Sequence, residues 1–437
     1  MNKTELKKFA ATFRSTLSQA FKQQLQALNL DDPTTLPSNP TPDYATLSRA
    51  LRALTPARVL ETATYTWFNR LVALRFMELR GLLPPEAPSP WDSRGHLLRS
   101  THQLATQLPQ IFTGPAYLDL FLPEDAALVP LLQPLLALAP QNFQSIETIG
   151  WLYQYYQQSS RRSQSRRPYT KSEVPAATQL FTPDWIVKFL VENSIGRWWL
   201  DHGGDPTLAQ NWSFLVPCSN PPSARTASPT HETSSLRPTP PPDPTTIKIF
   251  DPCCGSGHIL VYAFTVLEQI YRAAGFAAPD IPELILRHNL YGLDLDPRAA
   301  TLATLAVLLR ARLSDPAILH RPIAQTWCCH SFPDPAAFPR SLLDTPPTVA
   351  LQDQAHTLFD HFTLGQDFGS LLLPAATDFS TLTQYLAPTN PLSTYLSPYL
   401  TVHQLLADHY DFVITNPPYL RSTLMNQPLK NYLKDNF

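Results

Sequence analysis

The sequence predicts an α-helical domain over residues 1–160 and a Rossmann-like α/β domain over residues 179–437, joined by a basic linker at 161–178. Before the linker, apolar residues recur at three- and four-residue spacing, which indicates helices. After residue 246, short apolar runs alternate with helical patterns, which indicates a doubly wound parallel sheet. A glycine-rich turn directly after the first run is typical of a sheet that binds a nucleoside cofactor.

Within the helical domain, the apolar spacing predicts helices over residues 6–28, 65–77, 98–108, 126–138 and 149–156. Pro130 and Pro134 are expected to interrupt the fourth of these. The last is crowded with aromatic side chains, which we interpret as core and not as a platform for stacking bases. No strand–helix alternation occurs here, so this part should fold as a separate domain.

Composition limits the class of protein. The formal net charge of −2 gives no overall basic signature of nucleic-acid binding. The five cysteines include two adjacent pairs and make an odd total, which is unlike a disulfide framework and favours a reducing compartment. The polar N-terminus and the lack of a long apolar stretch predict a cytoplasmic protein.

Two segments are expected to be linkers. Residues 161–167 carry four arginines, which suit either contact with a phosphate backbone or a solvated hinge. Residues 217–246 are rich in Pro, Ser and Thr, and we expect this insert in the α/β domain to be disordered.

The α/β domain is expected to contain strands at 247–250, 289–295 and 410–415, with helices at 258–274 and 296–312. A further helix is expected over 179–196, with Thr182 as its N-cap and Pro183 in its first turn. Residues 327–391 show no clear pattern.

The glycine-rich turn carries the first set of candidate cofactor-binding residues. A phosphate-binding loop would need Lys-Ser or Lys-Thr after the second glycine, whereas His258 and Ile259 follow here. A dinucleotide site needs a third small residue, where Leu260 stands. S-adenosylmethionine has no phosphate and needs only close approach of the backbone. The candidates are Asp251, Pro252, Cys254, Gly255, Ser256 and Gly257.

The second expected strand ends in an acid. Asp294 is placed to hold both ribose hydroxyls of the cofactor, while Asp296 is better explained as the cap of the following helix. Thr182 and Pro183 either close over the methionine end of the cofactor or simply begin a helix.

The last expected strand ends in Asn416-Pro417-Pro418-Tyr419, the candidate catalytic residues. The Asn416 side-chain oxygen and the Pro417 carbonyl can each accept a hydrogen from an exocyclic amine, which directs its lone pair towards a methyl donor. Tyr419 can stack on a base extruded from duplex DNA. This pattern predicts transfer of a methyl group from S-adenosylmethionine to adenine in DNA.

Cysteine chemistry is less well supported. Pro252-Cys253 has the form of a cytosine-methylating nucleophile, but it lies in the cofactor turn. Cys328-Cys329-His330 lacks the spacing of a zinc site, and we expect no metal.

The order of these motifs resembles the PglX family, the adenine-specific DNA methyltransferases of BREX phage-resistance systems. The resemblance also rests on Thr66-Trp67-Phe68-Asn69-Arg70-Leu71 and Ile149-Gly150-Trp151-Leu152-Tyr153-Gln154. It implies a class I S-adenosylmethionine-dependent methyltransferase core, a double-stranded DNA substrate with a flipped adenine, and other BREX proteins as partners.

The family continues beyond its catalytic turn, so we expect the core here to be incomplete at the C-terminus and to need a second polypeptide for activity. Alternatives are a type II restriction–modification methyltransferase, an inactive remnant or partner-binding subunit, or methylation of RNA or protein glutamine.

Overall fold

The computed structural model describes residues 2–28, 42–83, 88–158, 182–217, 241–321, 329–373, 377–386, 390 and 392–436. The chain divides into two compact units, one formed by Met1–Arg161 with Pro316–Thr326 and one by Arg162–Asp315 with Trp327–Phe437. The grouping of Pro316–Thr326 with the first unit was not predicted from the sequence. Within the described ranges, no helix combines the length and the apolar character that crossing a bilayer requires.

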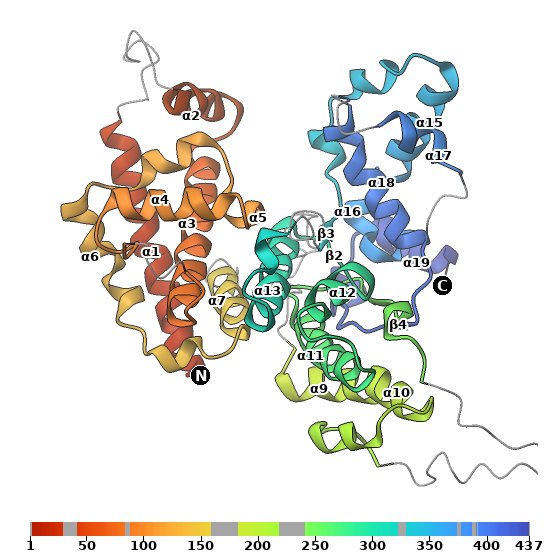
Figure 1. The fold of residues 1–437 in the computed structure, drawn as a ribbon. Helices are drawn as coiled ribbons and strands as arrows, with labels where there is room; N and C mark the ends of the chain where they lie inside the picture. Colours follow the sequence, from red (N-terminus) through yellow and green to blue (C-terminus); the bar gives the residue numbers. More distant parts are fainter. Residues whose placement is uncertain are drawn as a thin grey trace, which may run out of the picture. The chain divides into compact units, whose positions relative to one another are not determined.

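The first unit is helical, as the apolar spacing predicts (Figure 1). Helix α1 packs against α3 and α7, and aromatic rings fill the space between them. The Phe68 and Tyr156 ring centroids, for example, lie 4.9 Å apart, so the aromatic run near residue 150 is core. The helices are α1 (Lys3–Ala27), α2 (Pro42–Ala53), α3 (Pro56–Leu79), α4 (Arg94–Ala105), α5 (Pro109–Phe112), α6 (Asp125–Leu136) and α7 (Glu147–Gln158), with shorter turns η2 (Ala116–Phe121), η3 (Pro140–Phe143) and η8 (Ile318–His320).

Helix α6 corrects one prediction, because it runs through Pro130 and Pro134 without interruption. Both prolines lie on its exposed side, while Leu128 and Leu132 are buried on the other. On the exposed side, water can satisfy the carbonyl groups that a proline leaves without an N–H partner. Burial of the leucine side therefore outweighs the local cost of the prolines.

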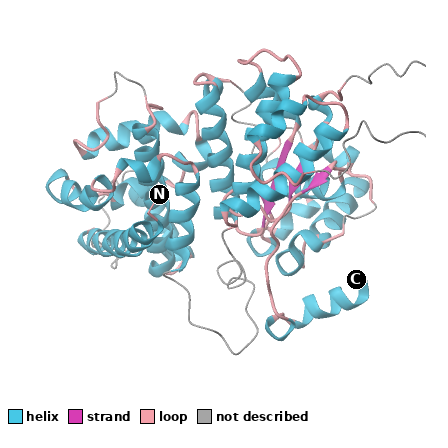
Figure 2. Cartoon of the chain, turned by 90° about the horizontal axis from the view of Figure 1, so that it is seen from below, coloured by secondary structure: helices cyan, strands magenta, loops and turns pink. Residues whose placement is uncertain are grey.

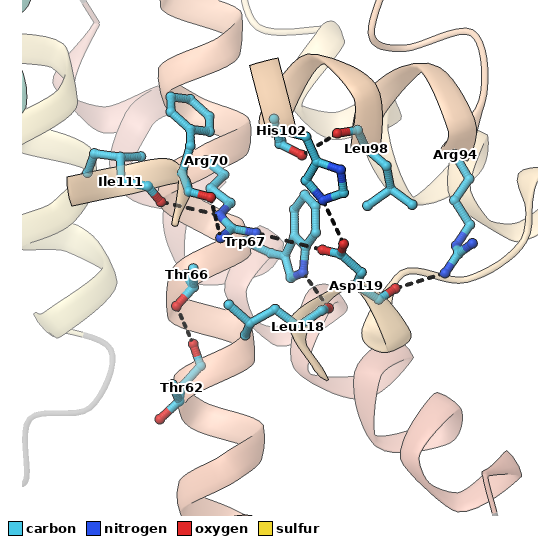
Figure 3. Close-up of polar contacts among 12 residues, drawn as sticks. Thr62, Thr66, Trp67, Arg70, Arg94, Leu98, His102, Ile111, Leu118 and Asp119 are labelled. Carbon is cyan, nitrogen blue, oxygen red and sulfur yellow. Dashed lines mark hydrogen bonds and ion pairs between the residues drawn. The ribbon is translucent and has the colours of Figure 1, made fainter. Parts of the chain in front are cut away.

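Two buried polar side chains of the first unit, those of Trp67 and Arg70, donate to backbone carbonyls (Figure 3). The Trp67 indole N–H donates to the Leu118 carbonyl at 2.9 Å. The Arg70 guanidinium donates to the Ile111 carbonyl at 3.2 Å and lies 4.0 Å from an Asp119 carboxylate oxygen. These bonds connect α3 to the segments that follow α4. They also provide the hydrogen-bond partners that a buried arginine needs.

The second unit contains a small parallel sheet of four strands in the order β3-β2-β1-β4. Figure 2 shows these strands among the more numerous helices. The strands are β1 (Ile249–Asp251), β2 (Leu290–Asp294), β3 (His330–Ser331) and β4 (Phe412–Val413). The predicted parallel sheet is therefore present with four strands, although each strand is short. The order of the strands reverses between β1 and β4, where sheets of this kind bind ligands at the carboxyl ends of the strands.

Both faces of the sheet are covered. Phe250 and Leu293 pack into a core formed with α15, α17 and α18. On the opposite face Gly292 lies against α11, where an added Cβ would stand 2.9 Å from the Leu260 side chain. The helices of the unit are α9 (Asp184–Val191), α10 (Arg197–Asp201), α11 (His258–Ala273), α12 (Ile281–His288), α13 (Pro297–Ser314), α15 (Val349–His361), α16 (Gly365–Phe368), α17 (Ser380–Tyr385), α18 (Ser393–Ala407) and α19 (Gln427–Asn436). The shorter turns are η4 (Glu192–Gly196), η5 (Pro206–Asn211), η7 (Pro244–Thr246), η9 (Pro335–Ala337), η10 (Arg340–Asp344), η11 (Gly369–Leu371) and η12 (Ser422–Leu424).

The start of α9 differs from the prediction. Pro183 is the N-cap and Thr182 makes no capping bond, while residues 179–181 lie outside the described residues. Because Pro183 and not Thr182 is the N-cap, the Thr182 hydroxyl does not cap α9 and can bond another group.

The insert is shorter at its end than predicted. Residues 244–246 form η7, and the Asn289 side-chain amide donates to the Pro244 and Ile247 carbonyls at 2.7 Å each. Residues 218–240 and the whole basic linker, 161–178, lie outside the described residues. Their expected disorder and phosphate contacts stay predictions.

Candidate functional site

A cavity of about 360 Å³ lies within the second unit at the carboxyl ends of the sheet strands. Residues just after β1, at the end of β2 and in the turn after β4 all contribute to its lining, which brings together the three motifs found in the sequence. Of the predicted site residues, those that line it are Pro252, Gly255, Asp294, Asn416, Pro417 and Pro418. Those that do not are Thr182, Pro183, Asp251, Cys254, Ser256, Gly257 and Tyr419.

The glycine turn has the backbone conformation that its sequence predicts. Gly255 and Gly257 have φ angles of 53° and 84°, in the left-handed region that favours glycine. A Cβ on Gly255 would meet no atom within 4 Å, so its open side faces the cavity. A Cβ on Gly257 would lie 2.9 Å from the Ala303 Cα, so this glycine allows α13 to approach the turn. The two glycines therefore serve different purposes, ligand approach and packing.

Asp294 connects the turn to the end of β2. Its two carboxylate oxygens accept hydrogen bonds from the backbone N–H groups of Gly255 and Asp296, each at 2.8 Å. Burial raises the pKa of this carboxyl to about 6. A carboxylate has about four lone-pair positions, so acceptor capacity remains that could take a ribose hydroxyl from the cavity side. Asp296 caps α13 by accepting from the Arg298 N–H at 2.9 Å, as predicted.

Asp251 stabilises the glycine turn by a hydrogen bond to its backbone. It is the last residue of β1, it is 1% exposed, and its carboxylate accepts from the Cys253 N–H at 3.2 Å. Burial raises the pKa of Asp251 to about 7. Because it does not line the cavity, its geometry fits shaping of the turn better than contact with a ligand.

The turn after β4 presents its acceptors to the cavity. The Ile414 N–H donates to the Phe250 carbonyl at 3.0 Å, which fixes the chain against β1 just before Asn416. The Asn416 side-chain nitrogen donates to the Thr182 hydroxyl at 3.0 Å. Tyr419 is 70% exposed and lies outside the cavity lining. This exposed ring, beside the half-buried Asn416 and the exposed Pro417, suits a planar group that arrives from solvent.

Other lining residues were missed by the sequence reasoning. Leu295 and Phe332 directly follow β2 and β3, a position that strand ends alone could have indicated. Residues 367–371 come from the stretch without a clear pattern. The glycine at position 369 was the one feature of this segment that could have indicated a turn, and its φ in the structure is 54°. Met425 and the α19 residues Leu429 and Leu433 add an apolar wall.

Asp367 adds a second acid to the cavity lining. Its carboxylate accepts from the Asn426 side-chain amide at 2.6 Å. The neighbouring Gln366 amide donates to the Phe332 carbonyl at 3.2 Å, and the Phe368 ring stacks on Tyr432 with centroids 4.0 Å apart. These contacts hold α16 against the end of β3 on one side and against α19 on the other.

The cavity lining fits a phosphate-free nucleoside. Among the described residues that line it, none is Lys or Arg, so a phosphate would find no cationic partner there. Apolar side chains, among them Leu295 and Phe332, stand beside the Asp294 carboxylate, as an aromatic base attached to a ribose would require. The volume lies within the range of small-molecule sites.

Comparisons with known proteins relate the chain to adenine-specific methyltransferases. Residues 288–437 match the family described as Eco57I restriction-modification methylase. All of this chain aligns at 30% identity with an adenine-specific methyltransferase, BrxX, of Escherichia coli O9:H4 (strain HS), covering 44% of that protein. The adenine-specific methyltransferase PglX of Lacticaseibacillus casei (strain Zhang) is 28% identical over 86% of this chain and 37% of its own length. The chain thus spans less than half the length of the curated relatives it matches.

Proposed function

The chain is homologous to the adenine-specific methyltransferases BrxX and PglX, and on that premise we propose that it is the part of a site-specific DNA adenine methyltransferase that binds S-adenosylmethionine and holds the target base. One observation carries the proposal. The glycine turn after β1, the acid that ends β2 and the Asn-Pro-Pro turn after β4 line a single cavity. A cofactor site and an amine-binding site are thereby contiguous, as direct methyl transfer requires.

The residues of the glycine turn and Asp294 would hold the cofactor. When bound, S-adenosylmethionine supplies an electrophilic methyl group. Gly255 would let the cofactor approach the backbone, Asp294 would accept from the ribose hydroxyls, and Leu295 and Phe332 would border its adenine. The remaining chemistry belongs to the turn after β4.

At that turn, the Asn416 side-chain oxygen and the Pro417 carbonyl would each accept one hydrogen of the adenine amine. With both hydrogens bound, the lone pair of the amine nitrogen would be directed towards the methyl group that the bound cofactor would supply. The methylated nitrogen releases one proton to water. The acceptors are placed before the base arrives, because two prolines restrict the backbone. Tyr419 would stack on the flipped base from its exposed position.

The test is methyl transfer to DNA by the full-length protein, using a methyl-labelled donor and nucleoside analysis of the product. We expect N6-methyladenine from the wild-type protein and a loss of at least about 100-fold with Asn416→Ala, in line with loss of a preorganised acceptor. Asn211→Ala is a matched control, since this exposed asparagine ends η5 away from the cavity. Label found in cytosine, RNA or protein, or equal activity of the two variants, contradicts the proposal.

We further propose that the methylation belongs to BREX-type phage defence, where it marks host DNA, and that other BREX proteins are partners. The resemblance of the helical blocks near residues 66–71 and 149–154 supports this. Sequencing of modified bases in host DNA, with the gene in its natural neighbourhood and with neighbouring genes deleted, tests the dependence on partners.

A further inference from the structure

We infer that Thr182 is a positioning residue for the catalytic Asn416, and that it acts on that side chain and not on the cofactor. The inference rests on the proposed function, because it concerns the acceptor that the methyl-transfer reaction uses. It changes the role that the sequence suggested for Thr182, which was to close over the methionine end of the cofactor or to cap a helix.

Thr182 neither caps α9 nor lines the cavity. Threonine before a helix commonly caps it, yet the N-cap of α9 is Pro183 and no side chain caps the helix. Nor does Thr182 line the cavity, where a contact with the cofactor would place it. Its side chain is only 8% exposed, so the hydroxyl is not held there for solvent.

The second line of support is the bond that Thr182 does make. Its hydroxyl oxygen accepts from the Asn416 side-chain nitrogen at 3.0 Å, across 234 positions of sequence. Leaving a buried hydroxyl without a hydrogen-bond partner costs free energy, so this bond is expected to persist. The bond therefore fixes Asn416 as much as it satisfies Thr182.

The orientation of the amide explains why this matters. An asparagine amide has donors on one side and an acceptor on the other. With the nitrogen of Asn416 bonded to Thr182 outside the cavity lining, the oxygen is the group left for the cavity. The adenine amine brings two hydrogens, so a rotated amide would oppose donor to donor. Donation to Thr182 also polarises the amide and strengthens its oxygen as an acceptor.

Because the backbone of this turn is restricted, rotation of the Asn416 side-chain amide is the main motion that could misplace its oxygen. Asn416 precedes Pro417, which restricts the Asn416 backbone to extended conformations, and proline fixes its own φ. The Pro417 carbonyl is thus placed by the chain alone, whereas the Asn416 oxygen needs a partner for its side chain. Thr182 supplies that partner from the start of α9.

The test compares Thr182→Val, which keeps the shape and removes the hydroxyl, with Thr182→Ser, which keeps the hydroxyl. In the full-length protein we expect Thr182→Val to lower the single-turnover methylation rate by about 10- to 100-fold, the effect of a misplaced reacting group. The Kd for S-adenosylhomocysteine should stay within about threefold of wild type. Thr182→Ser should restore most of the rate. Thermal unfolding of each variant reports folding, and Thr182→Ala provides a second deletion of the hydroxyl if the valine variant does not fold.

The outcomes separate the two claims. An active wild-type protein with an unchanged rate in both hydroxyl-deleting variants overturns the role of Thr182 and leaves the proposed function standing. Weaker binding of S-adenosylhomocysteine with an unchanged rate at saturation assigns Thr182 to the cofactor instead. A wild-type protein that does not methylate adenine overturns both.

Discussion

Replacement of Asp294 by asparagine should weaken cofactor binding at neutral pH and remove its dependence on pH. The carboxylate oxygens accept the backbone N–H groups of Gly255 and Asp296 at 2.8 Å each, and the acceptor capacity that remains would take the ribose hydroxyls. Asparagine has a single acceptor oxygen, so one of the two hydroxyl bonds is lost and the other is no longer charge-assisted. Hydrogen bonds to charged groups contribute about 1.5–3 kcal/mol each. We expect a loss of about 2–4 kcal/mol, which is roughly a 30- to 1,000-fold higher Kd.

The pH dependence follows from the raised pKa of Asp294, which burial brings to about 6. The ribose hydroxyls would donate to the ionised carboxylate, so binding favours the deprotonated form. Above pH 6 the carboxylate is already ionised and the affinity is full. Below pH 6 a proton must leave on binding, so the Kd should rise by up to about tenfold per pH unit.

The assay is isothermal titration with S-adenosylhomocysteine between pH 5 and pH 8, since this product analogue binds without turnover. Asp296→Asn is the matched control, because Asp296 caps α13 outside the cavity lining and asparagine caps as well as aspartate. The reasoning is refuted if Asp294→Asn binds within about threefold of wild type at pH 8, or if wild type shows no weakening between pH 6 and pH 5.

Two further predictions use neighbouring residues. Gly257→Ala should lower the free energy of unfolding in urea by about 2–4 kcal/mol, because a left-handed backbone is strained and the new Cβ would lie 2.9 Å from the Ala303 Cα. Gly255→Ala has the strain without the clash, so it should cost only about 1–2 kcal/mol, and equal losses would contradict this account. Tyr419→Ala should lower kcat/KM for DNA roughly 5- to 150-fold, the value of one stacked base, with no loss of thermal stability because the ring is 70% exposed. Tyr419→Phe keeps the ring and should retain most of the activity; a phenylalanine variant as slow as the alanine variant would exclude stacking.

Local sequence was sufficient for the elements that carry the motifs. Helices α1, α11 and α13 form within a few residues of where apolar spacing and caps place them, whereas α3 begins well before its predicted start at residue 65. The parallel sheet follows from strand and helix alternation. The glycine turn and Asp294 could be found because strand ends in such a sheet meet at one edge. What the turn needs, a left-handed backbone at Gly255, is a property of the residue itself.

Other features depend on packing between distant segments. Helix α6 continues through its prolines because its leucines are buried against neighbouring helices, which no local propensity can report. Residues 367–371 reach the cavity only because α16 is held between the end of β3 and α19. In both cases packing between distant segments decides the structure, and local helix propensity does not report it.

The residues that we propose to carry the chemistry could therefore be named from the sequence, because glycine, aspartate and the Asn-Pro-Pro-Tyr turn have properties that do not depend on their neighbours. How those residues are divided between lining the cavity and supporting it depends on packing in three dimensions. Asp251, Gly257 and Thr182 lie behind the lining residues, since a site needs a layer of packing and hydrogen bonds to fix its groups. That layer is assembled from residues far apart in the chain, and the spacing of residues along a sequence does not reveal it.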